Sequence, residues 1–170
     1  VSATAFGNRN RRITGDQFDQ FSVDFTFENG IHLHSMCRQI DGCSNRVSEF
    51  VQGAKGSWDS QTNEIRDLKG NLLWKYDDAA FGAEFTQHNP YVLEHVDWVN
   101  HIRKGTAHEE ATATAESSLA AVMGREAAYT GATVTWDEIS ASQADLAPAT
   151  LALGPVDMSR YTVAVPGTGR

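Results

Sequence analysis

Hydrophobic and polar residues alternate strictly along residues 21–28, FSVDFTFE, where a phenylalanine or valine occupies every second position. Because successive side chains of a strand point to opposite faces, this pattern predicts a β-strand with one apolar face. The pair Asn29-Gly30 follows. It favours a two-residue type I′ turn, in which both central residues have a positive φ. Residues 31–40 are therefore the expected return strand of a hairpin.

The register of this hairpin decides which residues share a face. A two-residue turn places Phe27 opposite His32 and Phe25 opposite His34, and opposed residues project from the same face. The phenylalanine face is then expected to continue into Arg38, while the other face mixes acidic and apolar residues. A sheet with apolar side chains on both faces is usually covered on both, so we expect helices on one face and a partner subunit or domain on the other.

The rest of the first half also has the composition and turn spacing of strands. They are expected at residues 1–7, 46–52 and 56–59 and, as two short strands, within 64–76. Together with the hairpin they make residues 1–76 the sheet-forming half of the chain. The prediction is one large, mostly antiparallel sheet.

The hydrophobic period becomes that of a helix after Asn89-Pro90, where Asn suits the N-cap and Pro the first helical position. Arg103 and Lys104 lie near the expected C-terminus, where the helix dipole favours cations, and Gly105 ends the helix. One stripe runs along it through Val92, His95, Val96, Val99 and Ile102. Such a stripe predicts a helix that packs on the sheet.

A second helix is expected over roughly 108–130, with Gly131 as its stop. Thr135 and Glu138 have the spacing of a capping box, which predicts a short helix near 136–142. Residues 88–142 thus form a helical segment. Residues 143–170 contain three of the four prolines, lose periodicity and are expected to wrap the domain as extended chain, with a strand-like piece at 160–166.

This order of elements predicts a single α+β domain, with two main helices packed on one face of the sheet and the other face available for oligomerisation. A length of 170 residues with 41% hydrophobic content suits one domain with a core. The net charge is −8 and no lysine or arginine cluster stands out, which argues against nucleic-acid binding. No apolar run is long enough for a membrane span. We expect Cys37 and Cys43 to be buried free thiols rather than a disulfide, although they could pair across a bend.

Several motifs that carry chemistry are missing from the sequence. There is no G-x-G-x-x-G, P-loop, C-x-x-C or H-E-x-x-H pattern, so no cofactor-binding, catalytic or metal residue is assigned. His32 and His34 could form a metal pair on one strand face, with His88 as a candidate third ligand. We favour the alternative that these imidazoles stack on Phe25 and Phe27, because no further ligand has diagnostic spacing.

Two other groups of polar residues are candidates for a site. Arg38 and Gln39 end the return strand beside a bend and are the candidates for lining a substrate pocket, although we favour a structural salt bridge or an exposed edge as their explanation. Asp97 and His101 lie one helical turn apart, which suits an acid–base pair. The simpler interpretation is a surface ion pair worth a few tenths of a kcal/mol.

The stretch NPYVLEHVDWVNHIRKG and the later AESSLAAVMGREAAYTGATVTWDEI resemble the C-terminal domain of the glucose–fructose oxidoreductase/inositol dehydrogenase (Gfo/Idh/MocA) family. The earlier DQFDQFSVDFTFENG and SMCRQIDGC resemble the sheet of that domain, in a subgroup frequent among exported bacterial proteins. The resemblance runs from residue 1 to about 141. One departure is His108, where the family usually has an Asn that caps the second helix.

The resemblance implies that an N-terminal Rossmann domain, which binds NAD or NADP, lies outside this chain together with the family's catalytic Asp-x-x-x-His helix. Asp97 and His101 copy that spacing in a later helix, so the catalytic role is not carried over to them. It further implies a homo-oligomer formed through the sheet, a small carbohydrate-like substrate, and a location in the bacterial cytoplasm or periplasm.

The expected function is therefore that of a substrate-binding and oligomerisation domain of an NAD(P)-dependent oxidoreductase that acts on a sugar, polyol or glycoside. The chain alone is expected to be inactive and to bind no cofactor. The alternatives are a non-enzymatic binding or assembly module that uses the sheet face, and a metal-dependent hydrolase built on His32 and His34.

Overall fold

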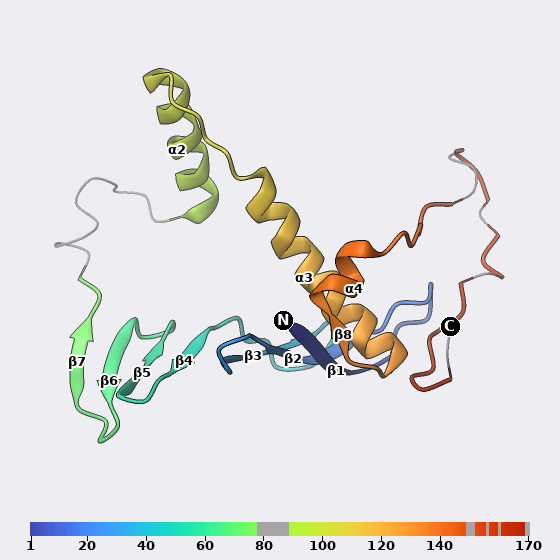
Figure 1. Ribbon diagram of the computed structural model, residues 1–170, viewed down its shortest axis with the longest axis horizontal. Helices are drawn as coiled ribbons and strands as arrows, with labels where there is room; N and C mark the ends of the chain where they lie inside the picture. Colours follow the sequence, from blue (N-terminus) through green and yellow to red (C-terminus); the bar gives the residue numbers. More distant parts are fainter. Residues whose placement is uncertain (78–88, 149–151, 156, 160, 169–170) are drawn as a thin grey trace. The chain divides into compact units, whose positions relative to one another are not determined.

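The computed structural model describes residues 1–77, 89–148, 152–155, 157–159 and 161–168. The chain divides into two compact units (Figure 1). Unit 1 comprises Val1–Cys43 and Glu110–Arg170, and unit 2 comprises Ser44–Glu109. Within the described residues, no helix combines the length and the hydropathy that crossing a membrane requires.

Unit 1 contains a four-stranded antiparallel sheet with the strand order β3-β2-β1-β8. Its strands are β1 (Ser2–Asn8), β2 (Gln20–Thr26), β3 (His32–Arg38) and β8 (Val134–Thr135). The long helix α3 (Ala111–Thr130) packs on β1 and β2, and the short helix α4 (Trp136–Ala141) packs beside α3 (Figure 1). One face of the sheet is thus covered by a helix of the same unit.

The core of unit 1 lies between α3 and the covered face of the sheet. It consists of Ala3, Ala5, Phe18, Val23, Met123, Ala127, Ala128, Tyr129 and Ile139. Small side chains let the helix approach the strands closely, and a Cβ added to Gly7 of β1 would lie 3.1 Å from Cβ of Ala128 on α3. Because interiors are close-packed, this arrangement leaves little room for larger residues.

Unit 2 contains a second four-stranded antiparallel sheet, with the strands in sequence order. Its strands are β4 (Phe50–Gln52), β5 (Gly56–Asp59), β6 (Glu64–Asp67) and β7 (Leu72–Lys75). Glu64 lies 2.6 Å from Arg66 Nη2 and 3.3 Å from Lys75 Nζ, so the β6–β7 hairpin carries a small charge network. The unit also contains helix α2 (Pro90–Lys104).

The α+β class, the antiparallel pairing and the two main helices are confirmed. The helix ends are confirmed as well: Asn89 caps α2, Gly105 ends it in the left-handed region, and Thr135 with Glu138 forms a capping box. The second helix begins at Ala111, a few residues later than expected. The strands form two sheets rather than one large sheet.

Only one of the two main helices packs on a sheet of its own unit. Helix α3 does so, whereas α2 buries no side chain and does not pack on β4–β7 in the part of unit 2 that the structure describes. The stripe residues Trp98 and Ile102 are 54% and 60% exposed, and His95 is exposed too. The predicted packing of this helix on strands is therefore not seen within the described part of unit 2, and a periodic stripe does not by itself specify its partner.

The register of the β2–β3 hairpin differs from the predicted one by one residue. Asp24 lies opposite His34 and Phe25 opposite Leu33. The cause is the turn, in which Gly30 has a φ of 74° while Asn29 does not have a positive φ. The N–H of Gly30 donates to the carbonyl of Phe27, and the N–H of Phe27 donates to that of Ile31. The loop therefore has three residues, and a one-residue shift moves every side chain of the return strand to the other face.

Two smaller predictions also fail. Cys37 and Cys43 are free, as expected, but both are exposed. For Cys37 the reason is that β3 is an edge strand beyond the part of the sheet that α3 covers. Residues 161–166 form no strand, although Ala164 packs against the core and the N–H of Gly167 donates to the carbonyl of Thr130.

Candidate functional site

The face of the unit 1 sheet opposite α3 carries three of the polar residues that the sequence singles out, His32, His34 and Arg38. We call it the open face. It is the face opposite α3, and it carries rows of residues from β1, β2 and β3 in turn. The rows are Ser2, Thr26 and His32; Thr4, Asp24 and His34; Phe6, Ser22 and Met36; and Asn8, Gln20 and Arg38.

A hydrogen-bonded network lies at the centre of the open face. Oδ2 of Asp24 lies 2.8 Å from Nδ1 of His32, and Oδ1 of Asp24 lies 3.9 Å from Nδ1 of His34. Nε2 of His34 is 3.0 Å from the hydroxyl oxygen of Ser22. Both histidine side chains are 56% exposed, so the network presents donors and acceptors to solvent.

This network corrects the prediction that the histidines stack on Phe25 and Phe27. The shifted register places His32 and His34 on the face of Asp24 instead. In the described part of the chain, His32 and His34 do not belong to a group of three side chains that could hold one metal ion. His88, the candidate third ligand, lies outside the described residues.

Apolar side chains lie beside this network. Phe6 and Met36 occupy one row of the open face, on either side of Ser22, and are 78% and 77% exposed. Large exposed apolar patches mark surfaces that contact other molecules, and these two side chains contribute apolar area to the open face. The open face thus combines apolar contact area with hydrogen-bonding groups.

The two candidate pocket residues have different positions. Arg38 occupies the last row of the open face, opposite Gln20, and is exposed. Gln39 follows the strand, and its backbone N–H donates to the carbonyl of Asp19. Arg38 is therefore part of the open face, whereas Gln39 fixes the strand end through its backbone N–H.

Asp19 is a buried carboxylate that the sequence did not single out. It is 3% exposed, and its oxygens accept hydrogen bonds from the backbone N–H groups of Asn10, Arg11 and Arg12 at 2.7–3.0 Å. These bonds, with that of Arg11 foremost, hold the pKa of the Asp19 carboxyl below its ordinary value. Asp19 orders the loop between β1 and β2 and so supports the end of the open face.

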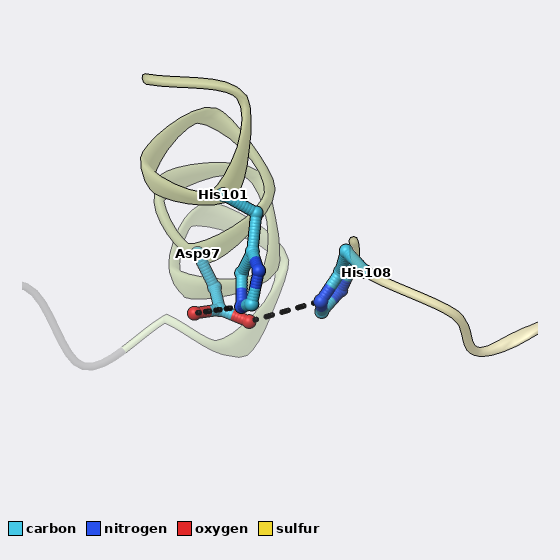
Figure 2. Close-up of side chains that lie close together, drawn as sticks. All are labelled: Asp97, His101 and His108. Carbon is cyan, nitrogen blue, oxygen red and sulfur yellow. Dashed lines mark ion pairs between the residues drawn. The ribbon is translucent and has the colours of Figure 1, made fainter. Parts of the chain in front are cut away.

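A second polar cluster lies in unit 2, where Asp97, His101 and His108 meet (Figure 2). Nε2 of His101 is 3.9 Å from Oδ1 of Asp97, and Nδ1 of His108 is 3.7 Å from Oδ2 of the same carboxylate. The proximity of Asp97 and His101 predicted from their spacing is confirmed. The third member was missed, because nothing in the spacing of residues 97–108 shows that the chain returns to the helix after Gly105.

No family model matches the chain, and no curated protein or solved structure matches it. The family resemblance of its sequence therefore stays a prediction. What the fold adds is a sheet with one covered and one open face, together with a compact cluster of imidazole and carboxylate groups in a separate unit.

Proposed function

We propose that this chain is the substrate-binding and oligomerisation domain of an NAD(P)-dependent oxidoreductase that acts on a sugar, polyol or glycoside. The proposal joins the sequence resemblance to one structural observation, the open face. There, Phe6 and Met36 are exposed in one row, with the Asp24 network on one side and Arg38 on the other.

The composition of the open face supports association with a second copy of the chain. Aromatic residues, methionine and arginine are the types enriched at protein interfaces, and Phe6, Met36 and Arg38 supply one of each. Two copies related by a two-fold axis would bring the same face together from both sides, which is the commonest symmetry of soluble oligomers. The polar network would then lie beside the apolar contact between the two copies.

The polar groups of the same face support a hydroxylated substrate. Both histidine rings lie within 3.9 Å of the Asp24 carboxylate, so acceptors and donors stand close together, as a ligand with several hydroxyl groups requires. In the proposed reaction a hydride leaves the carbinol carbon for the nicotinamide, and the hydroxyl proton passes to a base. Both the nicotinamide site and that base belong to the part of the enzyme outside this chain. The residues named here bind and orient the substrate.

The oligomerisation half of the proposal is tested by the mass of the 170-residue chain in solution, measured by light scattering after gel filtration. We expect an oligomer at micromolar concentration and a monomer for Met36→Asp. Val47→Asp is the matched control, since Val47 is 84% exposed but lies in unit 2. A monomeric wild-type chain, or a Met36→Asp variant that keeps its mass, would contradict the proposal.

The alternative is an assembly module that uses the same face without catalysis. The gene distinguishes the two. An enzyme requires a reading frame with about 150–200 further N-terminal residues that include G-x-G-x-x-G after a strand. A natural start just before Val1 favours the module.

A further inference from the structure

The end of helix α2 brings two potential metal ligands onto one side. Asp97 and His101 are one turn apart, so their side chains are neighbours on the helix surface. Nε2 of His101 and Oδ1 of Asp97 are 3.9 Å apart. Alone, this pair is an ordinary surface contact.

A third ligand arrives because of the way the helix ends. Gly105 has a φ of 64°, its N–H donates to the carbonyl of Ile102, and the N–H of Thr106 donates to the carbonyl of His101. These two bonds form a Schellman motif, which turns the chain back over the last helical turn. The turn places Nδ1 of His108 3.7 Å from Oδ2 of Asp97 (Figure 2).

The three side chains converge in a way that suits one ion. Their ligand atoms all lie within 4.8 Å of one another, and the two imidazole rings have centroids 4.5 Å apart. Two donors on a tetrahedral zinc ion, each at about 2.0–2.1 Å, are roughly 3.3–3.4 Å apart. The observed separations of 3.7 and 3.9 Å are longer than this and end on the two different oxygens of Asp97, so the side chains must rotate to bring all three groups onto one ion.

The surroundings of His101 are those of a metal ligand. Its other ring nitrogen, Nδ1, lies 2.9 Å from the hydroxyl of Thr106. When this hydroxyl accepts from Nδ1–H, the lone pair of Nε2 faces Asp97. Such an outer hydrogen bond is the usual means of fixing the tautomer and orientation of a ligating imidazole. The C-terminal end of a helix also attracts cations through its dipole.

We propose that Asp97, His101 and His108 bind one divalent ion of the zinc class. Two imidazoles and one carboxylate favour zinc and neighbouring transition metals, whereas magnesium and calcium prefer sets of oxygen ligands. Three protein ligands leave a fourth position for water, and the side chain of Asp97 is 60% exposed, so that position is open to solvent. The bound ion would fasten the segment after Gly105 to the end of α2. This site is independent of the oxidoreductase proposal.

The test is titration of the 170-residue chain with Zn²⁺ by isothermal calorimetry, and with Co²⁺ as a spectroscopic probe of coordination. We expect one equivalent of Zn²⁺ to bind at micromolar concentration. Loss of an outer hydrogen-bonding partner typically weakens metal affinity by ~10–100-fold, so Thr106→Val should weaken Zn²⁺ binding by about tenfold. His101→Gln and His108→Gln each remove a ligand and should weaken it by more than this range.

Two controls separate this cluster from other histidines. His95→Gln is the matched variant, because His95 lies on the same helix with Nδ1 3.4 Å from Glu94 but belongs to no group of three ligands in the described residues. The double variant His32→Gln/His34→Gln removes the histidines of the open face. Both should bind Zn²⁺ as the wild type does.

Absence of saturable Zn²⁺ binding to the wild-type chain would overturn the proposal. So would unchanged affinity in His101→Gln and His108→Gln, or loss of binding only in His32→Gln/His34→Gln, which would place the ion on the open face. Circular dichroism of each variant without metal shows whether it is folded. A variant that has lost its helical signal is replaced by Asp97→Asn, for which the same loss of binding is expected.

Discussion

Gly124 of α3 lies directly against Val23 of β2, and a Cβ added to Gly124 would be 3.0 Å from Cγ1 of Val23. The same Cβ would be 3.1 Å from Cζ of Phe25. The helix and the sheet therefore approach each other closely at a residue without a side chain. This contact packs α3 against the covered face of the sheet.

The contact predicts that a large side chain at position 124 separates the helix from the sheet. Gly124→Leu should lower the free energy of unfolding by roughly 1–3 kcal/mol, the usual cost of overpacking. Ala121→Leu is the control, since Ala121 is exposed on the same helix and the change should stay within about 0.5 kcal/mol. Urea denaturation followed by circular dichroism measures both. Equal stability of the two variants would show that α3 does not lie on Val23.

The corrected hairpin register predicts unequal roles for the two turn residues. Only Gly30 has a positive φ, so Gly30→Ala should cost roughly 1–2 kcal/mol of unfolding free energy. Asn29→Ala should cost much less, because within the described residues the Asn29 side chain accepts a single, exposed hydrogen bond, from the N–H of Ile31. In a two-residue type I′ turn, both substitutions would lower the free energy of unfolding substantially. If urea denaturation shows two similarly large losses, the register expected from the sequence is correct and the three-residue loop is wrong.

The buried carboxylate of Asp19 predicts a stability that depends on pH. Its pKa in the folded chain lies below the ordinary value of about 3.9, because backbone N–H groups, that of Arg11 foremost, bond its ionised form. The stabilisation is therefore complete above the ordinary pKa and is lost as the pH falls through the lower folded pKa.

Asp19→Asn should consequently be less stable than the wild type at neutral pH, and the difference should shrink as the solution is acidified below the ordinary pKa. Denaturation midpoints in urea across acidic and neutral pH measure this difference. Asp41→Asn, at an exposed position, is the control and should track the wild type throughout. If the difference in denaturation midpoint between Asp19→Asn and the wild type stays constant with pH, the ionised Asp19 carboxylate does not stabilise the fold as proposed.

The elements that the sequence predicted well are those fixed by neighbouring residues. Asn89 and Gly105 bound α2, and Thr135 caps α4 through its own hydroxyl, because each of these signals acts within one turn of helix. Strand β2 follows from the alternation of residues 21–28 in the same way. The capping of α3 is an exception, since Glu110 provides no side-chain cap.

The predictions that failed depend on contacts between distant residues or on a single backbone angle. The hairpin register turned on the φ of Asn29, and with it the faces of His32 and His34 were exchanged. The stripe of α2 indicated a buried side but carried no information on its partner. His108 could have been found only by recognising that Gly105 begins a Schellman motif that reverses the chain.

The central claim, that this domain serves a sugar-directed oxidoreductase, is tested most directly by assaying the full-length protein with NAD⁺ and NADP⁺ against a panel of monosaccharides, polyols and glycosides, with NAD(P)H fluorescence as the signal. We predict reduction of a cofactor that depends on one class of these substrates. Arg38→Ala should raise the KM for that substrate, whereas Arg46→Ala, at an exposed position of unit 2, should not. Failure of the folded full-length protein to reduce either cofactor with any member of the panel would contradict the claim.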